Sequence, residues 1–306
     1  MFLPGQTVLV CVSGGPDSVC LLESLVRLRR LFRVKLEVFH LDHQLRAGSA
    51  ADATYVSRLA ARHRVPFHLR RAEGSPGKGA SIEAWARAQR LRALSDVARE
   101  TGSARIAEGH TLDDQAETLL IALVRGGGLE ALAGIAPVLG SEIQPLLDVT
   151  RPEVEAACRS LGLRPRRDPT NADTRLLRNA IRLEGLPAME RATGRELAHT
   201  FARTADLLRR DEHELARQAL AAFDGVADES PEGWDLDASA LTTLPRALSS
   251  RVVRTALYRL GALPTEESID GVLDLAEGRP GRRRDLHGGA KAARGKVYVR
   301  LFIGPT

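Results

Sequence analysis

Residues 7–18 read TVLVCVSGGPDS, an apolar run followed by a turn that contains two glycines. The apolar run 7–12 is typical of a buried strand. Apolar residues then recur at helical spacing from Val19 to Val26 and predict a helix. A strand, a glycine turn and a helix at the start of the chain predict an α/β fold.

The next 100 residues repeat this alternation. Apolar runs at 34–40, 65–70 and 104–108 predict further strands, and helical patterns cover 49–63, 81–100 and the segment after Gly109. Strands that alternate with helices favour a doubly wound, mostly parallel sheet with helices on both faces. In such sheets ligands bind at the carboxyl ends of the strands.

The pattern changes after Pro145. We expect helices over 151–161, 175–184, 195–222, 245–260 and 266–277, a polar stretch over 164–174, a linker over 224–233, and strands near 282–286 and 296–303. This predicts an α/β domain over 1–185, a helical linker over 186–222 and a second, smaller α+β domain over 223–306.

Composition limits the class of protein. The longest apolar runs, such as 119–124, are far shorter than the roughly 20 residues of a membrane span. Residues 1–12 lack the basic start of a signal peptide, and three cysteines without a C-x-x-C pair suit a reducing cytoplasm. We therefore expect a cytoplasmic protein with no membrane partner.

The net charge of +5 directs attention to clusters of basic residues. Residues 279–300 hold eight Arg or Lys and one acid, and Arg282, Arg283 and Arg284 are consecutive. Such a cluster is typical either of a surface that binds nucleic-acid phosphates or of a solvated basic face. The sequence leaves both interpretations open.

The turn after the first strand has the composition of a phosphate-binding loop. Its residues are Ser13, Gly14, Gly15, Pro16, Asp17 and Ser18. Glycines expose backbone N–H groups and the start of a helix carries partial positive charge, so phosphate binds well there. Asp17 is suited to hold Mg²⁺ or to orient a nucleophile. The alternative is an ordinary helix cap, because the same residue types favour helix starts.

A second group of polar residues lies in 109–118, GHTLDDQAET. On a helix, His110, Asp114 and Glu117 lie on one face, with Asp113 beside them. A cap at Thr111 would explain one of the aspartates but neither the histidine nor the glutamate. One histidine among carboxylates favours Mg²⁺ over zinc.

These motifs resemble a known family. The strand followed by SGGPDS resembles the pyrophosphatase loop of the N-type ATP pyrophosphatases. The segment 109–118, RGGGL at 125–129, DPTN at 168–171 and RNAIR at 178–182 resemble elements of the tRNA(Ile)-lysidine synthetases. The match covers 7–185 closely, and LPRALSSRVVR (244–254) and DLHGG (285–289) match more loosely. The resemblance implies the short form of that family, which lacks a further C-terminal domain.

The resemblance implies an adenine-nucleotide α-hydrolase-like fold and an ATP-dependent ligase. Such an enzyme joins free L-lysine to the wobble cytidine of the CAU anticodon of tRNA(Ile) through an adenylated cytidine, with ATP and Mg²⁺. The alternatives are another adenylating enzyme of this fold, which thiolates tRNA or amidates a small molecule, and a non-catalytic RNA-binding protein. A homodimer is left open.

The chemistry of the residues and the family resemblance together suggest a role for each candidate residue. We expect Asp17, His110, Asp114 and Arg182 to be catalytic, Asp114 and Glu117 to bind lysine, and Asp113 to contact a substrate. The resemblance places His43 near the nucleotide and Arg90 at the substrate, although Gln44 stands where the family usually has glycine. Arg175, Arg178 and Arg182 share a predicted helix face, and three like charges there favour contact with RNA phosphates.

Overall fold

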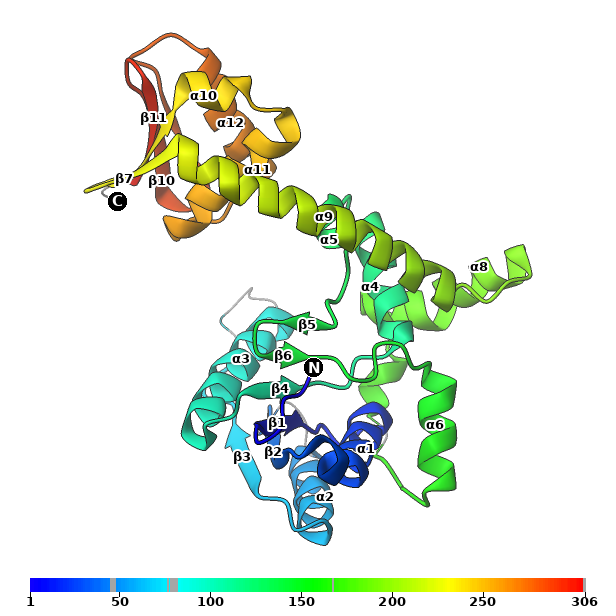
Figure 1. Ribbon diagram of the computed structural model, residues 1–306. Coiled ribbons are helices and arrows are strands. Elements are labelled where there is room, and N and C mark those ends of the chain that lie inside the picture. The colour runs from blue at the N-terminus through cyan, green and yellow to red at the C-terminus, as the bar shows by residue number, and fades with distance from the viewer. Residues whose placement is uncertain (45–47, 76, 78–81, 167, 305–306) are drawn as a thin grey trace. The chain divides into compact units, whose positions relative to one another are not determined.

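The computed structural model describes residues 1–44, 48–75, 77, 82–166 and 168–304, which form two compact units (Figure 1). The units are Met1–Arg209 and Arg210–Thr306. The boundary falls inside the long helix α9 (Ala198–Val226), within the segment 186–222 that we predicted as a helical linker. No helix in the described ranges is long and apolar enough to cross a membrane.

The first unit contains a six-stranded sheet in the order β3-β2-β1-β4-β6-β5. All neighbouring pairs are parallel except β5 and β6. The strands are β1 (Thr7–Cys11), β2 (Lys35–Asp42), β3 (Phe67–Arg71), β4 (Arg105–Ala107), β5 (Val138–Leu139) and β6 (Glu142–Ile143). The mostly parallel sheet confirms the predicted fold class. The sequence did not predict β5 and β6, because strands of two residues carry no periodicity.

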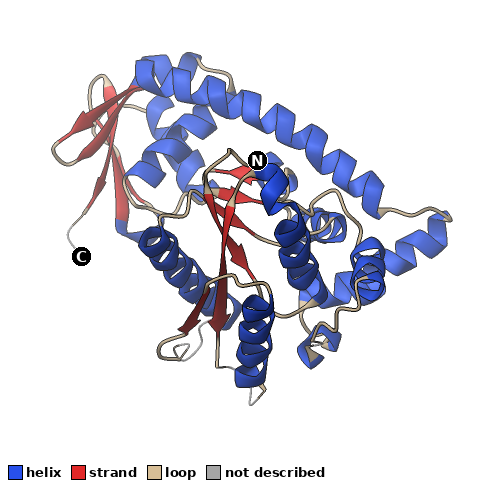
Figure 2. Cartoon of the chain, turned by 60° about the horizontal axis from the view of Figure 1, so that its bottom comes forward, coloured by secondary structure: helices blue, strands red, loops and turns tan. Residues whose placement is uncertain are grey.

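Successive side chains of β1 point to opposite faces of the sheet and are buried in two different hydrophobic cores. Val8 and Val10 are buried against α1 (Pro16–Phe32), α2 (Ser49–Arg62) and α6 (Arg151–Ser160). Leu9 is buried on the opposite face against α3 (Ile82–Thr101). Figure 2 shows helices on both sides of these strands. Residue 81, the predicted start of the third helix, lies outside the described residues.

The strand order creates a switch point beside β1. The chain runs from β1 outward through β2 to β3 and then returns to β4 on the other side of β1. At such a point the loops that follow the two strands diverge and leave a crevice, which is where ligands bind in this class of sheet. The glycine loop follows β1 and the His110 motif follows β4, so the fold brings both to this crevice.

The helices after β4 differ from the prediction in several places: short helices at 129–132 and 186–193 were not predicted, and the helix predicted over 175–184 is shorter. They are α4 (Leu112–Val124), α5 (Leu129–Leu132), the 3₁₀ turn η1 (Pro169–Ala172), α7 (Leu177–Ala180), the π-helical turn η2 (Ile181–Gly185) and α8 (Leu186–Thr193). The helix that we predicted over 175–184 begins at Leu177. Arg175 therefore precedes it and does not share its face.

The second unit contains an antiparallel sheet in the order β7-β8-β11-β10-β9. Its strands and helices are β7 (Ala227–Ser230), β8 (Gly233–Asp237), β9 (Arg283–Asp285), β10 (Ala290–Arg294), β11 (Tyr298–Ile303), α10 (Ala238–Thr243), α11 (Arg246–Arg259) and α12 (Glu266–Glu277), with the 3₁₀ turn η3 (His287–Gly289). Buried side chains of β8, β10 and β11 pack against the three helices. This arrangement is the predicted α+β type.

The predicted linker over 224–233 is wrong. Residues 227–230 form the edge strand β7, which pairs with β8. The acidic residues that suggested a linker, Asp228 and Glu229, are exposed on this edge strand. Charged side chains are common there because they discourage pairing with other chains.

Candidate active site

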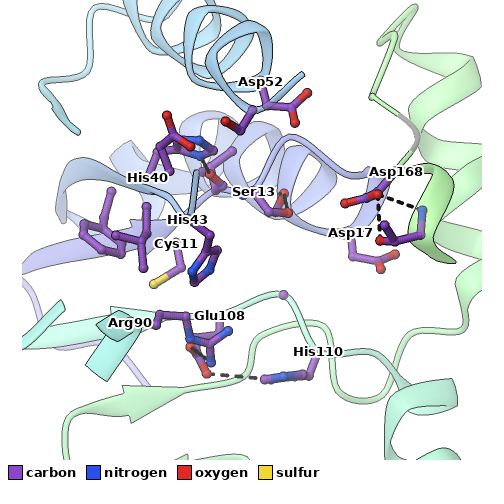
Figure 3. Close-up of a pocket in the computed structure, with 18 of the residues that line it drawn as sticks. Cys11, Ser13, Asp17, His40, His43, Asp52, Arg90, Glu108, His110 and Asp168 are labelled. Carbon is purple, nitrogen blue, oxygen red and sulfur yellow. Dashed lines mark hydrogen bonds and ion pairs between the residues drawn. The ribbon is translucent and has the colours of Figure 1, made fainter. Parts of the chain in front are cut away.

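A cavity of about 500 Å³ lies at the switch point, at the carboxyl ends of β1, β2 and β4 (Figure 3). The predicted site residues that line it are Ser13, Asp17, Ser18, His43, Arg90, His110 and Asp114. Further polar lining residues are His40, Asp42, Ser49, Asp52, Glu108, Asp168 and Thr170. The glycine loop and the His110 motif, about 90 residues apart in sequence, thus reach one cavity.

The glycine loop is folded by its own hydroxyl groups. Ser18 Oγ accepts hydrogen bonds from the N–H groups of Ser13 (3.1 Å) and Gly14 (3.2 Å), and Ser13 Oγ accepts one from Gly15 (3.4 Å). Gly14 has φ +96°, which favours glycine. Gly15 is the N-cap of α1, followed by Pro16, and makes no side-chain capping bond. Gly15 at the N-cap and Pro16 after it are also typical of an ordinary helix start, so both interpretations of this turn fit the start of α1.

Asp17 presents a carboxylate oxygen that has no hydrogen-bond partner among the residues that the structure describes. It lies in the first turn of α1, and its Oδ1 is buried without a hydrogen bond. Burial raises the pKa of Asp17 to about 6, against the lowering effect of the nearby Arg151 charge. Within the described residues no group of three His, Cys, Asp or Glu side chains is arranged to hold a metal. One free carboxylate suits Mg²⁺ that is held partly by substrate phosphates.

Gly109 explains why the His110 motif sits so close to the glycine loop. A Cβ at this position would lie 3.2 Å from the carbonyl carbon and oxygen of Asp17 and 3.3 Å from Ser18 N. These are backbone atoms, which cannot easily give way. A side chain at position 109 would therefore push the two motifs apart.

Asp114 combines the two roles that the sequence left as alternatives. Its Oδ2 accepts hydrogen bonds from the backbone N–H and the hydroxyl of Thr111, so it completes the capping box of α4. Its Oδ1 lies 3.3 Å from Arg151 Nη2. Burial opposes ionisation, but the Thr111 hydrogen bonds and the Arg151 charge together lower the pKa of Asp114. It is a cap residue and a cavity carboxylate at once.

Glu117 lies in a buried ion cluster. Its side chain is 1% exposed, and its carboxylate lies 3.1 Å from Arg151, 3.3 Å from Arg182 and 3.5 Å from Arg178. It is not among the residues that line the cavity. Asp113 also faces Arg151, whose backbone N–H it accepts at 2.6 Å. Sequence reasoning missed Arg151, which links all three acids of the motif.

The three arginines predicted to share one face have carboxylate partners within the protein. Arg178 and Arg182 pair with Glu117, and Arg178 also donates to Thr118 Oγ1 at 2.8 Å. Arg175 is 89% exposed and pairs with Asp173 at 2.7 Å. Protein carboxylates thus relieve the repulsion from which we inferred RNA phosphates. RNA contact by these arginines stays a prediction.

Residues of the second strand and of the segment before residue 167 connect neighbouring elements around the glycine loop. His40 Nδ1 donates to the carbonyl oxygen of Val12 at 2.7 Å, so this histidine ties β2 to β1. Asp52 at the start of α2 pairs with Arg166, whose backbone N–H donates to Gly14 O at 2.9 Å. Arg166 thereby connects α2 to the glycine loop.

His43 and Gln44 follow β2. His43 lines the cavity, its Nδ1 is buried without a partner, and burial lowers its pKa, as does the charge of Arg90. Gln44 has φ +56°, a left-handed conformation that favours glycine. The loop thus adopts here a conformation suited to the glycine that usually occupies this position in the resembled family.

Two polar residues that the sequence analysis missed surround His110. Glu108 directly follows β4, and its Oε1 accepts from Arg90 Nη2 at 2.8 Å. Gln144 follows β6, donates to Glu108 Oε2 at 3.2 Å and lies 2.9 Å from His110 Nδ1. Figure 3 shows Arg90, Glu108 and His110 along one wall of the cavity. Glu108 was detectable as the acid directly before Gly109 at a strand end, whereas Gln144 had no such signal.

The consecutive arginines of the second unit do not form one surface. Arg282 and Arg283 are exposed. The side chain of Arg284 lies across α12, where a Cβ at Gly271 would be 2.6 Å from its Nε, and its Nη1 lies 3.4 Å from Asp274. Strand alternation in β9 separates Arg283 from Arg284.

Comparisons with known proteins identify both units. Residues 3–189 match the family model of the PP-loop domain, and residues 236–298 match that of the TilS substrate binding domain. A solved structure of a tRNA thiolase from Methanococcus maripaludis superposes with a TM-score of 0.60 at 15% identity, over 68% of this chain and 73% of that one. At that identity the likeness shows the fold alone.

Curated relatives are similar over most of the chain. A tRNA(Ile)-lysidine synthase of Symbiobacterium thermophilum is 41% identical over 90% of this chain, which spans 61% of that protein. The enzymes of the same name from Methylobacterium nodulans and Thermobifida fusca are 40% and 36% identical. For both, the match covers 92% of this chain, and it covers 86% and 90% of theirs respectively.

Proposed function

This chain belongs to the tRNA(Ile)-lysidine synthase family, and on that basis we propose that it uses ATP to join free L-lysine to the wobble cytidine of the CAU anticodon of tRNA(Ile). The observation that carries the proposal is the single cavity that contains a PP-loop together with the His110 and Asp114 face. The match of the second unit to a substrate-binding domain of the same family supports tRNA as the substrate.

In the first step, the 2-oxo oxygen of the cytosine attacks the α-phosphorus of ATP. The bond between that phosphorus and the β-bridging oxygen breaks, and pyrophosphate leaves. We propose that Ser13, Gly14, Gly15 and Ser18 bind the pyrophosphate at the start of α1, with Pro16 setting the turn. Asp17 would hold Mg²⁺ with its unpartnered Oδ1, and this ion would neutralise charge on the departing phosphates.

In the second step, the ε-nitrogen of lysine bonds to C2 of the cytosine, the C2–O bond breaks, and AMP leaves. Free lysine has a pKa of about 10.4, so the neutral amine costs roughly 4–5 kcal/mol at pH 7. A proton acceptor near the amine is therefore needed. We assign this role to His110, because imidazole changes protonation near neutral pH and His110 lines the cavity beside Asp114.

The remaining residues divide between orientation and substrate contact. Asp114 is our candidate for binding the lysine amine within the cavity. Glu117 is buried with three arginines, so its supported role is to hold Arg178 and Arg182 in position for RNA. His43 and Arg90 line the cavity and are proposed as contacts of the nucleotide and the cytidine.

Two other functions are less well supported. Thiolation through an iron–sulfur cluster requires several cysteine ligands. Of the three cysteines, all within the described residues, Cys11 lines the cavity, whereas Cys20 and Cys158 are buried in the core between α1 and α6. A protein that only binds RNA would not need a carboxylate such as Asp17, whose Oδ1 is buried beside the glycine loop without a hydrogen bond from the described residues.

ATP, tRNA and free lysine all occur in the cytoplasm, which supports that location.

The test is mass spectrometry of nucleosides after incubation of the chain with tRNA(Ile), ATP and isotopically labelled lysine. We expect label in the wobble nucleoside and one AMP per lysine incorporated. Pyrophosphate release without tRNA would indicate a small-molecule amidating enzyme. RNA binding without any pyrophosphate release would indicate a non-catalytic protein.

A further inference from the structure

We propose that Gln144 is a positioning residue that fixes the tautomer of His110, so that Nε2 carries the lone pair. The statement about the tautomer stands on the geometry of the protein alone. Its consequence for the reaction rests on the proposed function, in which His110 accepts a proton from lysine.

Gln144 connects His110 to a charged pair. It is 4% exposed and follows β6. Its Nε2 donates to Glu108 Oε2 at 3.2 Å, and its Oε1 lies 2.9 Å from His110 Nδ1. The other carboxylate oxygen of Glu108 accepts from Arg90 at 2.8 Å. The four side chains therefore form one chain of hydrogen bonds.

The charged groups determine which atom donates and which accepts in each of these hydrogen bonds. A guanidinium only donates and an ionised carboxylate only accepts, so Glu108 requires a donor from Gln144. The amide nitrogen of Gln144 must then face Glu108, and its carbonyl oxygen must face His110. An oxygen acceptor beside Nδ1 requires that Nδ1 carry the hydrogen. In the neutral imidazole, Nε2 is then left without a proton.

The direct contact between His110 and Glu108 points the same way. The distance from His110 Nδ1 to Glu108 Oε2 is 3.8 Å, too long for a hydrogen bond. The carboxylate still favours a hydrogen rather than a lone pair on the nearer nitrogen. Both neighbours of Nδ1 therefore stabilise the same tautomer.

This arrangement gives His110 the form that the second step needs. When the lysine nitrogen bonds to C2, an N–H bond of the amine breaks and an N–H bond forms at Nε2 of His110. The hydrogen on Nδ1 stays on that nitrogen throughout and donates a hydrogen bond to Gln144 Oε1. Because an amide does not take up a proton, Gln144 orients the ring without competing for the transferred proton.

The direct test is a long-range ¹H–¹⁵N correlation spectrum of the eight histidines in the full chain without substrates. The variant His110→Gln identifies the signals of His110. We expect a protonated Nδ1 and a bare Nε2 when the imidazole is neutral. A neutral His110 that carries its hydrogen on Nε2 in the unmutated chain would overturn the proposal, whatever any variant does.

The variant Gln144→Met removes the acceptor at similar volume and should shift His110 toward a mixture of tautomers. The matched control is Gln115→Met. Gln115 is also a buried glutamine, but its amide bonds to the backbone of Ile135. We expect the His110 signals to be unchanged in the control. Equal shifts in both variants would show a general disturbance of packing and would contradict the proposal.

Kinetics separate this inference from the proposed function. In Gln144→Met we expect lysine transfer near neutral pH to fall about 3- to 10-fold, as for the removal of one hydrogen bond, while pyrophosphate release changes less. If the tautomer is as stated but no lysidine forms, the proposed function fails and the positioning stands. If lysidine forms but His110 has the opposite tautomer, the positioning alone fails.

Discussion

Arginines of the two units looked alike in the sequence and differ in the structure. Arg178 and Arg182 converge on Glu117, which is 1% exposed, while Arg282 and Arg283 are exposed in the second unit. Clustered positive charge in a sequence therefore has two meanings. Arginines that can reach a buried carboxylate bind it and help to form a site within the protein. Arginines whose side chains are exposed are available to bind a partner such as RNA.

The difference has an energetic consequence. Charges in a buried cluster interact strongly and their effects are not additive, whereas exposed charges are screened by water and salt and act almost independently. We therefore expect large, coupled effects from substitutions in the first unit. In the second unit we expect small, additive effects that depend on salt.

The largest effect should come from the substitution Asp17→Asn in the cavity of the first unit. This change removes the unpartnered carboxylate beside the glycine loop, so AMP formation should fall at least about 100-fold. The measurement is single-turnover AMP release with tRNA, ATP and lysine. Turnover close to that of the unmutated chain would show that this carboxylate serves no catalytic step.

The same variant tests the electrostatics without substrates. The pKa of Asp17 is raised from 3.8 to about 6, so protonated Asp17 favours the folded state. That contribution is complete below about pH 4 and is lost as the pH rises through about 6. The melting temperature of Asp17→Asn, relative to the unmutated chain, should therefore increase between pH 4 and pH 7. A difference independent of pH would contradict the raised pKa.

The part of this site that could be predicted has a simple physical basis. The loop 13–18 and the segment 109–118 were recognisable from the sequence. Their signals, which are glycines, capping residues and helical spacing, come from residues that are close together in the chain. Arg151 and Gln144 were missed because their partners lie more than 30 residues away, and nothing in their neighbours marks them. Strands β1 to β4 of the first sheet were predictable, because apolar runs alternate there with helical patterns. The edge strand β7 was not, because its exposed acids resemble those of a linker.

The next largest effect should come from Glu117→Gln. The substitution leaves three partly exposed guanidinium groups without the buried carboxylate that they share, and the free energy of unfolding should fall by about 1.5–3 kcal/mol. Chemical denaturation measures this change. Glu184→Gln, an exposed acid in the neighbouring turn η2, is the control and should change it by less than about 0.5 kcal/mol.

The outcome also decides the role that the sequence first suggested for Glu117. A stable variant that needs much more lysine, with an unchanged requirement for ATP, would return Glu117 to lysine binding. In contrast, a destabilised variant that is partly rescued by adding Arg178→Gln would demonstrate coupling within the cluster. That coupling is the property that distinguishes this cluster from the arginines of the second unit.

A smaller effect is expected from Arg282→Gln combined with Arg283→Gln. Removing one cation that binds a phosphate lowers the slope of log affinity against log salt by about 0.7 for a single strand and about 0.9 for a duplex. If both arginines bind phosphates, the double variant should lower the slope by roughly 1.4–1.8. Filter binding of tRNA(Ile) at several salt concentrations measures the slope. An unchanged slope would assign the pair to a solvated face and leave RNA binding to other residues.

The smallest effect should come from Arg284→Gln, one residue farther along β9. Its guanidinium lies over Gly271 and pairs with Asp274, so it already has a partner within the protein. Removal of a partly exposed ion pair costs about 0.2–1 kcal/mol of stability, and we expect the salt slope for tRNA to change by less than about 0.3. The single variant Arg283→Gln, measured beside it, should lower the slope by about 0.7–0.9 with little change in stability. An equal decrease of the slope in the two variants would mean that Arg284 leaves Asp274 when RNA binds, and the division between partnered and available arginines would not hold in this unit.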